Sequence, residues 1–517
     1  MELIKKIKEE EKLLFLFGIV VYLPFMVNQL NNADGVTNGI LYHGKAYEWE
    51  NAQGRFFLKF FDLWRGRMIF PQLIIFVSLV ILLISIRYLW KIFEIDGILS
   101  KMLIGCLILF APSVANLFTY YYCADSYTFA YLLSILAAYI LIKKQPKHFW
   151  KAMLLSVISL GIYQTYLGMT ILLCAFWLIM EMLRNEIEMR VLLKKFCYFV
   201  AVVVGSAVLY LIIFKFLDYI GYLAPTDTRE MDHMFDAMVL RLGSTIFLAY
   251  RVFFDYFFTD NIINNSWQCR TLFNIVIFVC IILLIIFLII KNKVYQFPMK
   301  MAALLCSLLV LPVLHTIIVI LGPGASVYAE TGLLMLAYMN YFYIFMILLI
   351  KMIKINLKKR IFEGILFLPI VINLFIMTQF VGVFERTIEL EQTKMKALAY
   401  QIEGRIESLG GYKTNKKVLV VGRPQRGNYP FTDDDFYEIT KGMISRYSLI
   451  FGAPDQVSYG WIQVFKYFLG VNYIECSIEE REKVMNSGIL DEMENFPDMN
   501  SVCENGDIII VKLSSPY

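Results

Sequence analysis

The feature that most constrains this chain is a series of about eleven apolar stretches, most of them close to the ~20 residues that cross a bilayer as a helix. The sequence of 517 residues is 59% hydrophobic, with a mean hydropathy of +0.62. This excludes a soluble globular protein, which would have to expose much of that apolar surface to water. In order, the predicted spans are residues 13–27, 69–88, 99–117, 125–142, two helices within 152–183 that meet near Gln164, and then 196–217, 272–290, 302–321, 333–350 and 361–381.

Lysine and arginine in the short loops predict the orientation, because basic residues collect on the cytoplasmic side. The turns at 116–124, at Gln164 and at 322–331 contain no lysine or arginine and are expected outside. An odd number of spans then places everything after Val381 outside as well. We expect a multi-pass protein of a bacterial cytoplasmic membrane with an extracytoplasmic C-terminus. The basic positions are Lys5, Lys6, Lys8, Arg87, Lys91, Lys143, Lys144, Lys147, several residues within 184–195, Lys291, Lys293 and several within 351–360.

The polar and apolar patterns predict two domains. The first, residues 1–384, is a transmembrane domain with long external loops at 28–68 and 218–270. The second, residues 385–517, is polar and contains two strand-like segments with helical stretches between them, which predicts a small extracytoplasmic α/β domain. The predicted strands are residues 417–422 and 507–511. The fold class is therefore a polytopic α-helical membrane protein of about eleven transmembrane helices with this domain appended.

The two long external loops are rich in aromatic residues. Residues 54–64 place their aromatic side chains on one helical face, with Lys59 and Asp62 opposite, which is typical of a helix lying in the membrane interface. Residues 253–258 predict a second interfacial helix in the other loop. The aromatic face of the first helix consists of Phe56, Phe57, Phe60, Phe61 and Trp64.

Cysteine, histidine and net charge point to no metal centre and no nucleic-acid partner. Most of the nine cysteines lie inside predicted spans and act there as small apolar residues. Cys476 and Cys503 both lie in the external domain, where a disulfide and two unpaired thiols are equally compatible with the sequence. The cytoplasmic loops account for the net charge of +5.

Ionisable residues near the outer ends of the spans are the functional candidates, because a charge is expensive to keep at the bilayer. Asp34 follows the first span, where a polar turn would also explain it. Asp125 opens the fourth span, where an acid is also a common helix cap. Arg55 and Arg67 flank the aromatic segment and can either anchor it to lipid headgroups or hold a phosphate.

A polar and aromatic turn at the same face completes the candidate site. Tyr163, Gln164 and Tyr166 lie where two predicted helices meet, although a simple loop would need no such residues. A functional role is favoured because two acids, an arginine and this turn all lie at the outer membrane face, where a lipid-linked substrate would present its headgroup.

Four short motifs occur in a distinctive order. These are Asp34-Gly35, Gly54-Arg55-Phe56, Ala124-Asp125-Ser126-Tyr127, and Ser159 to Tyr166 with the sequence SLGIYQTY. Over residues 1–350 this pattern resembles the GtrII-type glucosyltransferase family, which is similar to the wider GT-C-like class of polytopic glycosyltransferases that use polyprenyl-phosphate sugars. Many members have two adjacent acids in the first loop, whereas this chain has Ala33-Asp34, so the second carboxylate would have to come from Asp125.

The resemblance implies transfer of a sugar, expected to be glucose, from a polyprenyl-phosphate carrier to a cell-envelope polysaccharide, O-antigen or teichoic acid. Asp34 would be the general base and Asp125 a second carboxylate. Arg55, with Arg67 nearby, would bind the phosphate, while the turn at 163–166 would line the sugar pocket. No cofactor is required by this scheme, although Mg²⁺ or Mn²⁺ is an alternative to arginine at the phosphate. Expected partners are the lipid-linked donor, the glycan acceptor, the bilayer, and an upstream polyprenyl-phosphate glycosyltransferase and small flippase.

Two other classes of protein share some of these features. A transporter or flippase for lipid-linked saccharides is also polytopic, but it usually places ionisable groups and helix breaks near the midplane in two related halves. This chain has its acids at helix ends, no evident repeat, and long external loops. A scaffolding subunit would leave the positions of Asp34 and Asp125 unexplained.

Overall fold

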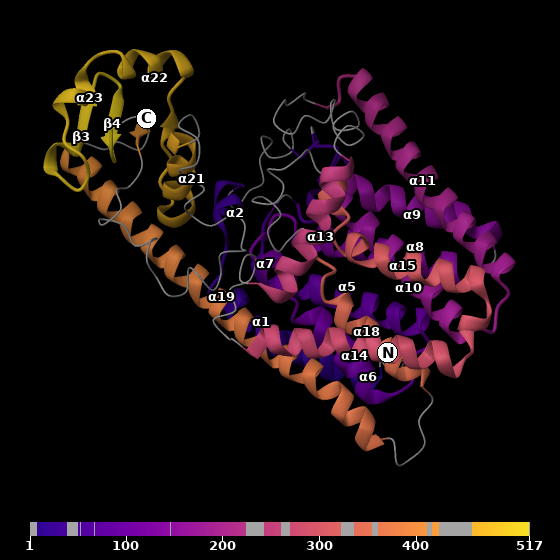
Figure 1. The fold of residues 1–517 in the computed structure, drawn as a ribbon. Coiled ribbons are helices and arrows are strands. Elements are labelled where there is room, and N and C mark those ends of the chain that lie inside the picture. The colour runs from indigo at the N-terminus through magenta and orange to yellow at the C-terminus, as the bar shows by residue number, and fades with distance from the viewer. Residues whose placement is uncertain are drawn as a thin grey trace.

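The computed structural model describes residues 8–38, 50–51, 53–66, 68–144, 146–223, 242–259, 269–321, 336–353, 360–410, 416–422 and 457–515. The described chain is mostly helical. A large helical bundle is joined by one long helix, α19, to a smaller part that contains a β-sheet (Figure 1).

Seven of the described helices are long and apolar enough to cross a membrane, as expected of a polytopic membrane protein. Two shorter apolar helices, α6 and α18, accompany them. The bundle consists of α1 (Glu9–Val27), α5 (Pro71–Ile92), α6 (Ile98–Leu109), α7 (Pro112–Leu117), α8 (Ala124–Lys143), α9 (Phe149–Ile162), α10 (Leu167–Arg184), α11 (Met189–Tyr219), α13 (Leu242–Phe258), α14 (Cys269–Lys291), α15 (Pro298–His315), α16 (Ile318–Leu321), α18 (Tyr341–Met352) and α19 (Arg360–Ser408).

Short elements connect the long ones. Two short helices, α2 (Ala33–Asn38) and α4 (Lys59–Trp64), lie in the first external loop of the sequence prediction. The 3₁₀ turns are η2 (Pro146–His148), η3 (Gln164–Tyr166) and η5 (Val294–Gln296).

The boundaries confirm some predicted spans and divide others. The predicted pair of helices meeting near Gln164 is present as α9 and α10, separated by η3. The predicted span 99–117 is instead two helices, because Ala111 is extended before Pro112, and a residue before proline is driven away from helical geometry. The predicted span 302–321 is likewise interrupted after His315, between α15 and α16.

Helix α8 lies at the centre of the bundle and packs on α5, α9 and α10. Small buried residues on α8, including Ala130, Ala137 and Ala138, allow its neighbours to approach closely. Hydroxyl groups link the same helices, since Ser134 Oγ lies 2.9 Å from Ser159 Oγ of α9. This packing fixes the start of α8, where Asp125 lies, against the turn between α9 and α10.

The C-terminal part contains a four-stranded sheet in the order β2-β1-β4-β3. Strand β1 is parallel to β2 and β4, while β3 is antiparallel to β4. Both strands predicted from the sequence are present, as β1 and β4. The elements are β1 (Lys417–Val421), α21 (Val457–Leu469), β2 (Ile474–Glu475), α22 (Ile478–Met485), α23 (Ile489–Glu492), η8 (Met499–Ser501), β3 (Val502–Asn505) and β4 (Ile508–Lys512).

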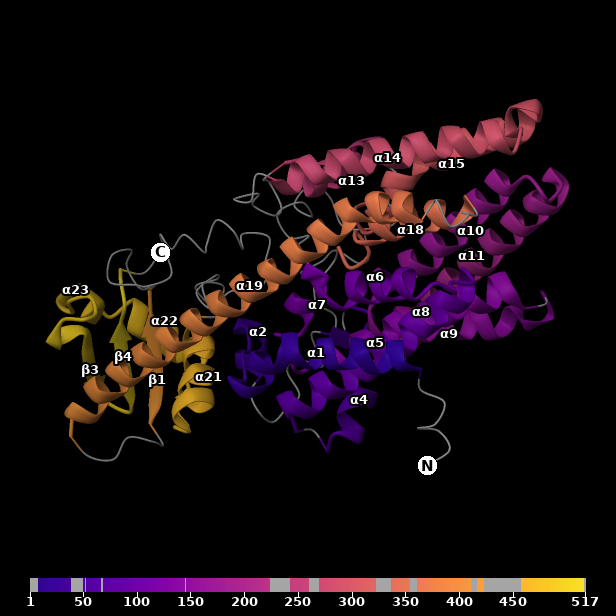
Figure 2. The same ribbon diagram turned by 90° about the horizontal axis from the view of Figure 1, so that it is seen from below.

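Alternating side chains of β1 cover the two faces of the sheet with different helices. Val418 and Val420 pack in a core with α19 and α21, whereas Leu419 and Val421 pack with α22 and α23. The predicted domain boundary at 384/385 falls inside α19, which therefore contributes to both parts of the chain (Figure 2). Cys476 and Cys503 are unpaired thiols in the structure.

Candidate active site

The segment that carries the Gly-Arg-Phe motif packs directly on the turn between α9 and α10. Gln164 donates one hydrogen bond to the Gln53 carbonyl (2.5 Å) and another to the Tyr210 hydroxyl (3.0 Å). The Phe57 N–H donates to the Gly161 carbonyl at 2.8 Å. Gly54 has φ +80°, and a Cβ there would lie 2.1 Å from Tyr210 Oη, so only glycine fits. Two of the four sequence motifs are therefore in contact.

Arg55 is buried at the centre of this contact. Its guanidinium forms an ion pair with Glu50 and donates a hydrogen bond to Tyr127 Oη at 2.9 Å. It also lies 5.0 Å from the ring centroid of Tyr163, which stacks on Tyr127 at 4.2 Å. Burial alone would lower the pKa of Arg55, but Glu50 and the neighbouring phenols of Tyr127, Tyr163 and Tyr122 together outweigh burial and hold that pKa well above its ordinary value.

Asp125 is also paired with an arginine. Its Oδ2 lies 3.6 Å from Arg65 Nε, and both side chains are at most 2% exposed. Asp125 Oδ1 accepts a hydrogen bond from the Ser126 N–H at 2.8 Å, in the first turn of α8. Arg65 in addition donates to the carbonyls of Tyr121 (3.3 Å) and Tyr122 (2.9 Å). The pair therefore fixes the turn at residues 118–123 to the α4 segment.

Asp34 lies on α2 beside the same turn and is partly exposed. Asn32, just before α2, donates from its backbone to the Thr119 carbonyl and from Nδ2 to Thr119 Oγ1, each at 3.1 Å. Burial raises the pKa of Tyr122 well above its ordinary value, and the charges of Glu50 and Asp34 act in the same direction. Both acids therefore lie within electrostatic range of the Tyr122 phenol, next to the Asp125–Arg65 pair.

The segment of the chain that carries these motifs matches a known protein family. The family model described as Glucosyl transferase GtrII matches residues 23–350, which is more than half of the chain and contains all four motifs. The chain belongs to the GtrII glucosyl transferase family. Neither the comparison with curated proteins nor that with solved structures gives a match.

In this GtrII chain the structure brings most of the predicted site residues together. Arg55 and Tyr163 are in direct contact, and Tyr166 packs edge-on against Tyr163 at 5.5 Å. Gln164 holds the Gly54 segment in place through its hydrogen bond to the Gln53 carbonyl. This structural role is in addition to the predicted contact with the sugar. Arg67 lies outside the described residues. The catalytic and binding roles assigned to these residues, and to Asp34 and Asp125, remain predictions.

Four residues of the GtrII site were not predicted. Glu50 is one of two nearby acids, with Glu48, in a polar stretch and gives no signal of its own in the sequence. Arg65 is one of three arginines between residues 55 and 67, and the spacing does not indicate which one meets Asp125. Tyr122 and Tyr127 flank the Ala-Asp-Ser motif, so their proximity to Asp125 in the sequence could have singled them out.

The aromatic segment around α4 differs from the predicted interfacial helix. Phe56 is buried against Tyr210, with ring centroids 5.6 Å apart, and Phe57 contacts Gly161. Phe60 and Trp64 are half exposed, at 54% and 50%. Only the second half of the predicted aromatic face is therefore available to lipid, because the first half fills the space beside the α9–α10 turn.

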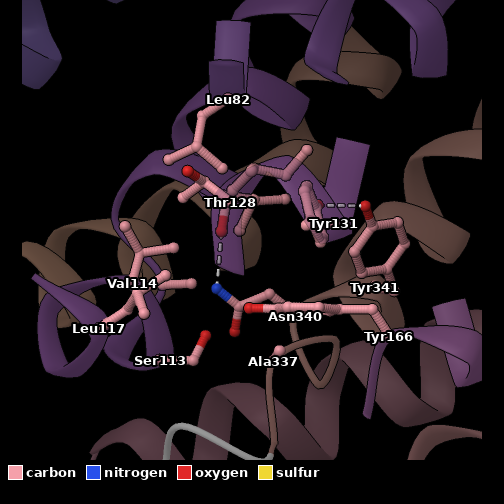
Figure 3. Close-up of a pocket in the computed structure, with 13 residues that line it drawn as sticks. Leu82, Ser113, Val114, Leu117, Thr128, Tyr131, Tyr166, Ala337, Asn340 and Tyr341 are labelled. Atoms are coloured by element: carbon pink, nitrogen blue, oxygen red, sulfur yellow. Dashed lines mark hydrogen bonds between the residues drawn. The ribbon is translucent and has the colours of Figure 1, made fainter. Parts of the chain in front are cut away.

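A pocket lies in the bundle between α5, α6, α7, α8 and the start of α18 (Figure 3). Tyr166 is among its lining residues, and Tyr131 and Tyr341 share a hydrogen bond of 2.5 Å in its wall. Asn340 Nδ2 donates to the Leu107 carbonyl at 2.7 Å, whereas Asn340 Oδ1 is buried and has no hydrogen-bond partner within the described part of the chain. The lining also includes the hydroxyl groups of Ser113, Thr128 and Tyr166, and its other side chains are aliphatic.

The described acids are arranged around arginines and do not form a metal cage. Among the described residues, no group of three or more His, Cys, Asp or Glu side chains could hold a metal ion. Glu50 and Asp125 each have a buried arginine instead.

Proposed function

We propose that this GtrII protein transfers glucose from a polyprenyl-phosphate carrier to a cell-envelope polysaccharide, O-antigen or teichoic acid on the outer face of the membrane. The observation that carries the proposal is the gathering of the four motif segments around the turn at residues 118–123 in a chain of this family. The buried arginines supply positive charge for a phosphate, and the stacked tyrosines supply flat faces of the kind that sugars pack on.

Asp34 suits the role of general base better than the other two acids. It is partly exposed, so an acceptor hydroxyl can approach it, whereas Glu50 and Asp125 are buried with arginines. In the reaction the acceptor oxygen forms a bond to the anomeric carbon and the bond from that carbon to the phosphate oxygen breaks. The acceptor proton passes to Asp34, and the lipid phosphate leaves with the bonding electrons.

Arg55 is the proposed partner of the departing phosphate. Its Nε is buried and has no hydrogen-bond partner among the described residues, so at least one donor remains for a ligand beside the bonds to Glu50 and Tyr127. A negative phosphate arriving beside this guanidinium would compete with Glu50 for it. Asp125 then has a different role from the one first expected, because it orients Arg65 and the turn that carries Tyr122.

We also propose how the chain is oriented in the membrane. About eleven spans in a GT-C-like arrangement would place the start of α8, the α9–α10 turn and the C-terminal domain outside the cytoplasm. A lipid-linked donor suits that side, where nucleotide sugars are absent. A polyprenyl-phosphate glycosyltransferase acting upstream would make the donor, and a small flippase would move it across the bilayer. A divalent metal such as Mg²⁺ or Mn²⁺ is the alternative to arginine for stabilising the negative charge of the leaving phosphate.

Two measurements test this function. Deletion of the gene, followed by sugar analysis of the envelope polymers, should reveal the loss of one sugar substituent that the wild-type gene restores. Purified full-length protein in proteoliposomes should transfer radiolabelled glucose from polyprenyl phosphate to the polymer isolated from the deletion strain.

The Asp34→Asn variant sharpens the test. It keeps the size and hydrogen bonding of the side chain but cannot take up the proton, so turnover should fall by about 10²–10⁴-fold with normal membrane levels. Transfer at the wild-type rate by this variant would refute Asp34 as the base. Movement of the labelled lipid across the bilayer without glycan labelling would instead identify a flippase.

A further inference from the structure

Helix α2, which carries Asp34, lies between the bundle and the C-terminal domain. In two views it is placed beside α21 (Figures 1 and 2), and the two helices are in contact. One side of the α2 segment is held by the bundle, through the two hydrogen bonds from Asn32 to Thr119. The other side is held by the C-terminal domain.

The contact with the C-terminal domain is apolar at its centre. Ala33 and Val36 of α2 are 2% and 0% exposed, and they belong to the same hydrophobic cluster as Trp461 of α21 and Val418 of β1. A six-residue helix is too short to be stable in isolation, so its position depends on such packing. Two residues of the membrane half are thus part of the core of the C-terminal domain.

Three hydrogen bonds surround this apolar contact. The Asn31 N–H donates to Gln392 Oε1 of α19 at 3.1 Å, and Asn31 Nδ2 donates to Tyr467 Oη of α21 at 3.4 Å. Tyr459 Oη of α21 donates to the Thr37 carbonyl at 3.4 Å. Both ends of α2 are therefore bound to helices of the C-terminal part, with Asp34 between them.

We propose that the C-terminal domain is a positioning element of the transfer site, which fixes α2 and thereby aims Asp34 at the acceptor. The inference rests on the proposed function, because it assigns a task to the domain through the proposed base. Trp461, Tyr467 and Gln392 are positioning residues in this scheme and do not touch the substrate. Loss of their contacts reduces the rate of the chemical step and leaves donor binding at Arg55 in place.

The test uses the full-length protein with Val36→Ala, which removes apolar contact from the α2 side and leaves the C-terminal sequence unchanged. A second variant, Gln392→Ala with Tyr467→Phe, removes the two hydrogen bonds to Asn31 and the bond from Gln392 Nε2 to the Asn28 carbonyl. Matched controls are Gln401→Ala and Tyr400→Phe, since both residues are exposed on α19. Each protein is examined by hydrogen exchange of a peptide covering residues 31–38 and by steady-state glucose transfer.

The expected result is faster exchange in residues 31–38 and a fall in kcat of about 10²-fold, the scale of a misplaced catalytic group. The KM for the lipid donor should stay within about twofold, because the donor phosphate contacts are unchanged. The control variants should match the wild type in both measurements. A role in folding alone would lower the amount of protein without lowering kcat.

Two outcomes overturn the inference. Unchanged exchange in both variants would show that the domain does not hold α2, and faster exchange with normal kcat would show that holding it does not matter for transfer. Failure of the proposed function is recognised separately, because it appears as normal transfer by Asp34→Asn whatever the exchange data show.

Discussion

The buried pair of Asp125 and Arg65 gives the sharpest prediction, because the structural task that we propose for Asp125 differs from the catalytic one that the sequence indicated. Both side chains are at most 2% exposed, and the Oδ2–Nε distance is 3.6 Å. Removing one member leaves the other charge buried and uncompensated, which costs about 3–5 kcal/mol. Loss of a simple helix cap would cost only about 1 kcal/mol. Asp125→Asn should therefore destabilise the protein far more than a cap variant would.

The effect can be measured as thermal unfolding of the purified protein in detergent. With roughly 2 °C per kcal/mol for a large chain, Asp125→Asn should lower the midpoint by about 6 °C or more. The double variant Asp125→Leu with Arg65→Leu removes both charges and should recover much of this loss, because replacing a buried ion pair by apolar residues is often close to neutral. Transfer should be measured per folded molecule in each case. A normal midpoint in Asp125→Asn combined with a large loss of kcat would refute this reasoning and restore Asp125 as a catalytic carboxylate.

Three further predictions concern the phosphate partner, the Gly54 turn and the topology. The double variant Arg55→Ala with Glu50→Gln leaves no unpaired buried charge, so it should fold, yet its KM for the lipid donor in the transfer assay should be raised. Arg55→Lys should recover only part of this loss, because lysine cannot bind the phosphate through two donors at once. A normal KM for the donor in both variants would argue against phosphate binding. Gly54→Ala should destabilise the protein by more than the roughly 1–2 kcal/mol that an alanine in the left-handed conformation costs, because its Cβ would also clash with Tyr210. Gly66→Ala in the same loop has open space around it, so thermal unfolding should show only the cost of the left-handed conformation. A reporter that is active only in the cytoplasm, fused after Tyr517, should be silent, and strong activity would reverse the proposed orientation.

The sequence was sufficient for features set by local composition. Long apolar stretches need only enough residues to cross a bilayer, so α5, α8 and α14 agree with the predicted spans to within a few residues. The strands β1 and β4 are short runs of β-branched residues between turn signals, which is a local pattern too. Interruptions of the spans were harder to place. The break at Pro112 has a local cause that could have been used, whereas the break after His315 has none that is evident in the sequence.

The site was predictable only as far as its motifs. Their order along the chain indicated that Arg55, Tyr163 and Asp125 would lie at one membrane face, and the structure places Arg55 against Tyr163. Which charges pair could not be predicted, because the choice between Arg65 and Arg67 for Asp125 depends on the path of the α4 segment. Glu50 escaped notice for the same reason, since its pairing with Arg55 follows from tertiary packing.

The pairing of charges changes how the three acids of the site should be ranked. A buried carboxylate that faces an arginine is out of reach of solvent and is occupied by that partner, so it is poorly placed to take a proton from an incoming hydroxyl. Glu50 and Asp125 are both in this situation, whereas Asp34 lies partly exposed on a short helix that the C-terminal domain holds in place. The chain has one acid, Asp34, where many family members have two adjacent acids, and this difference is then no obstacle to catalysis. The site needs one accessible base, and its remaining carboxylates serve to orient the arginines that face the phosphate.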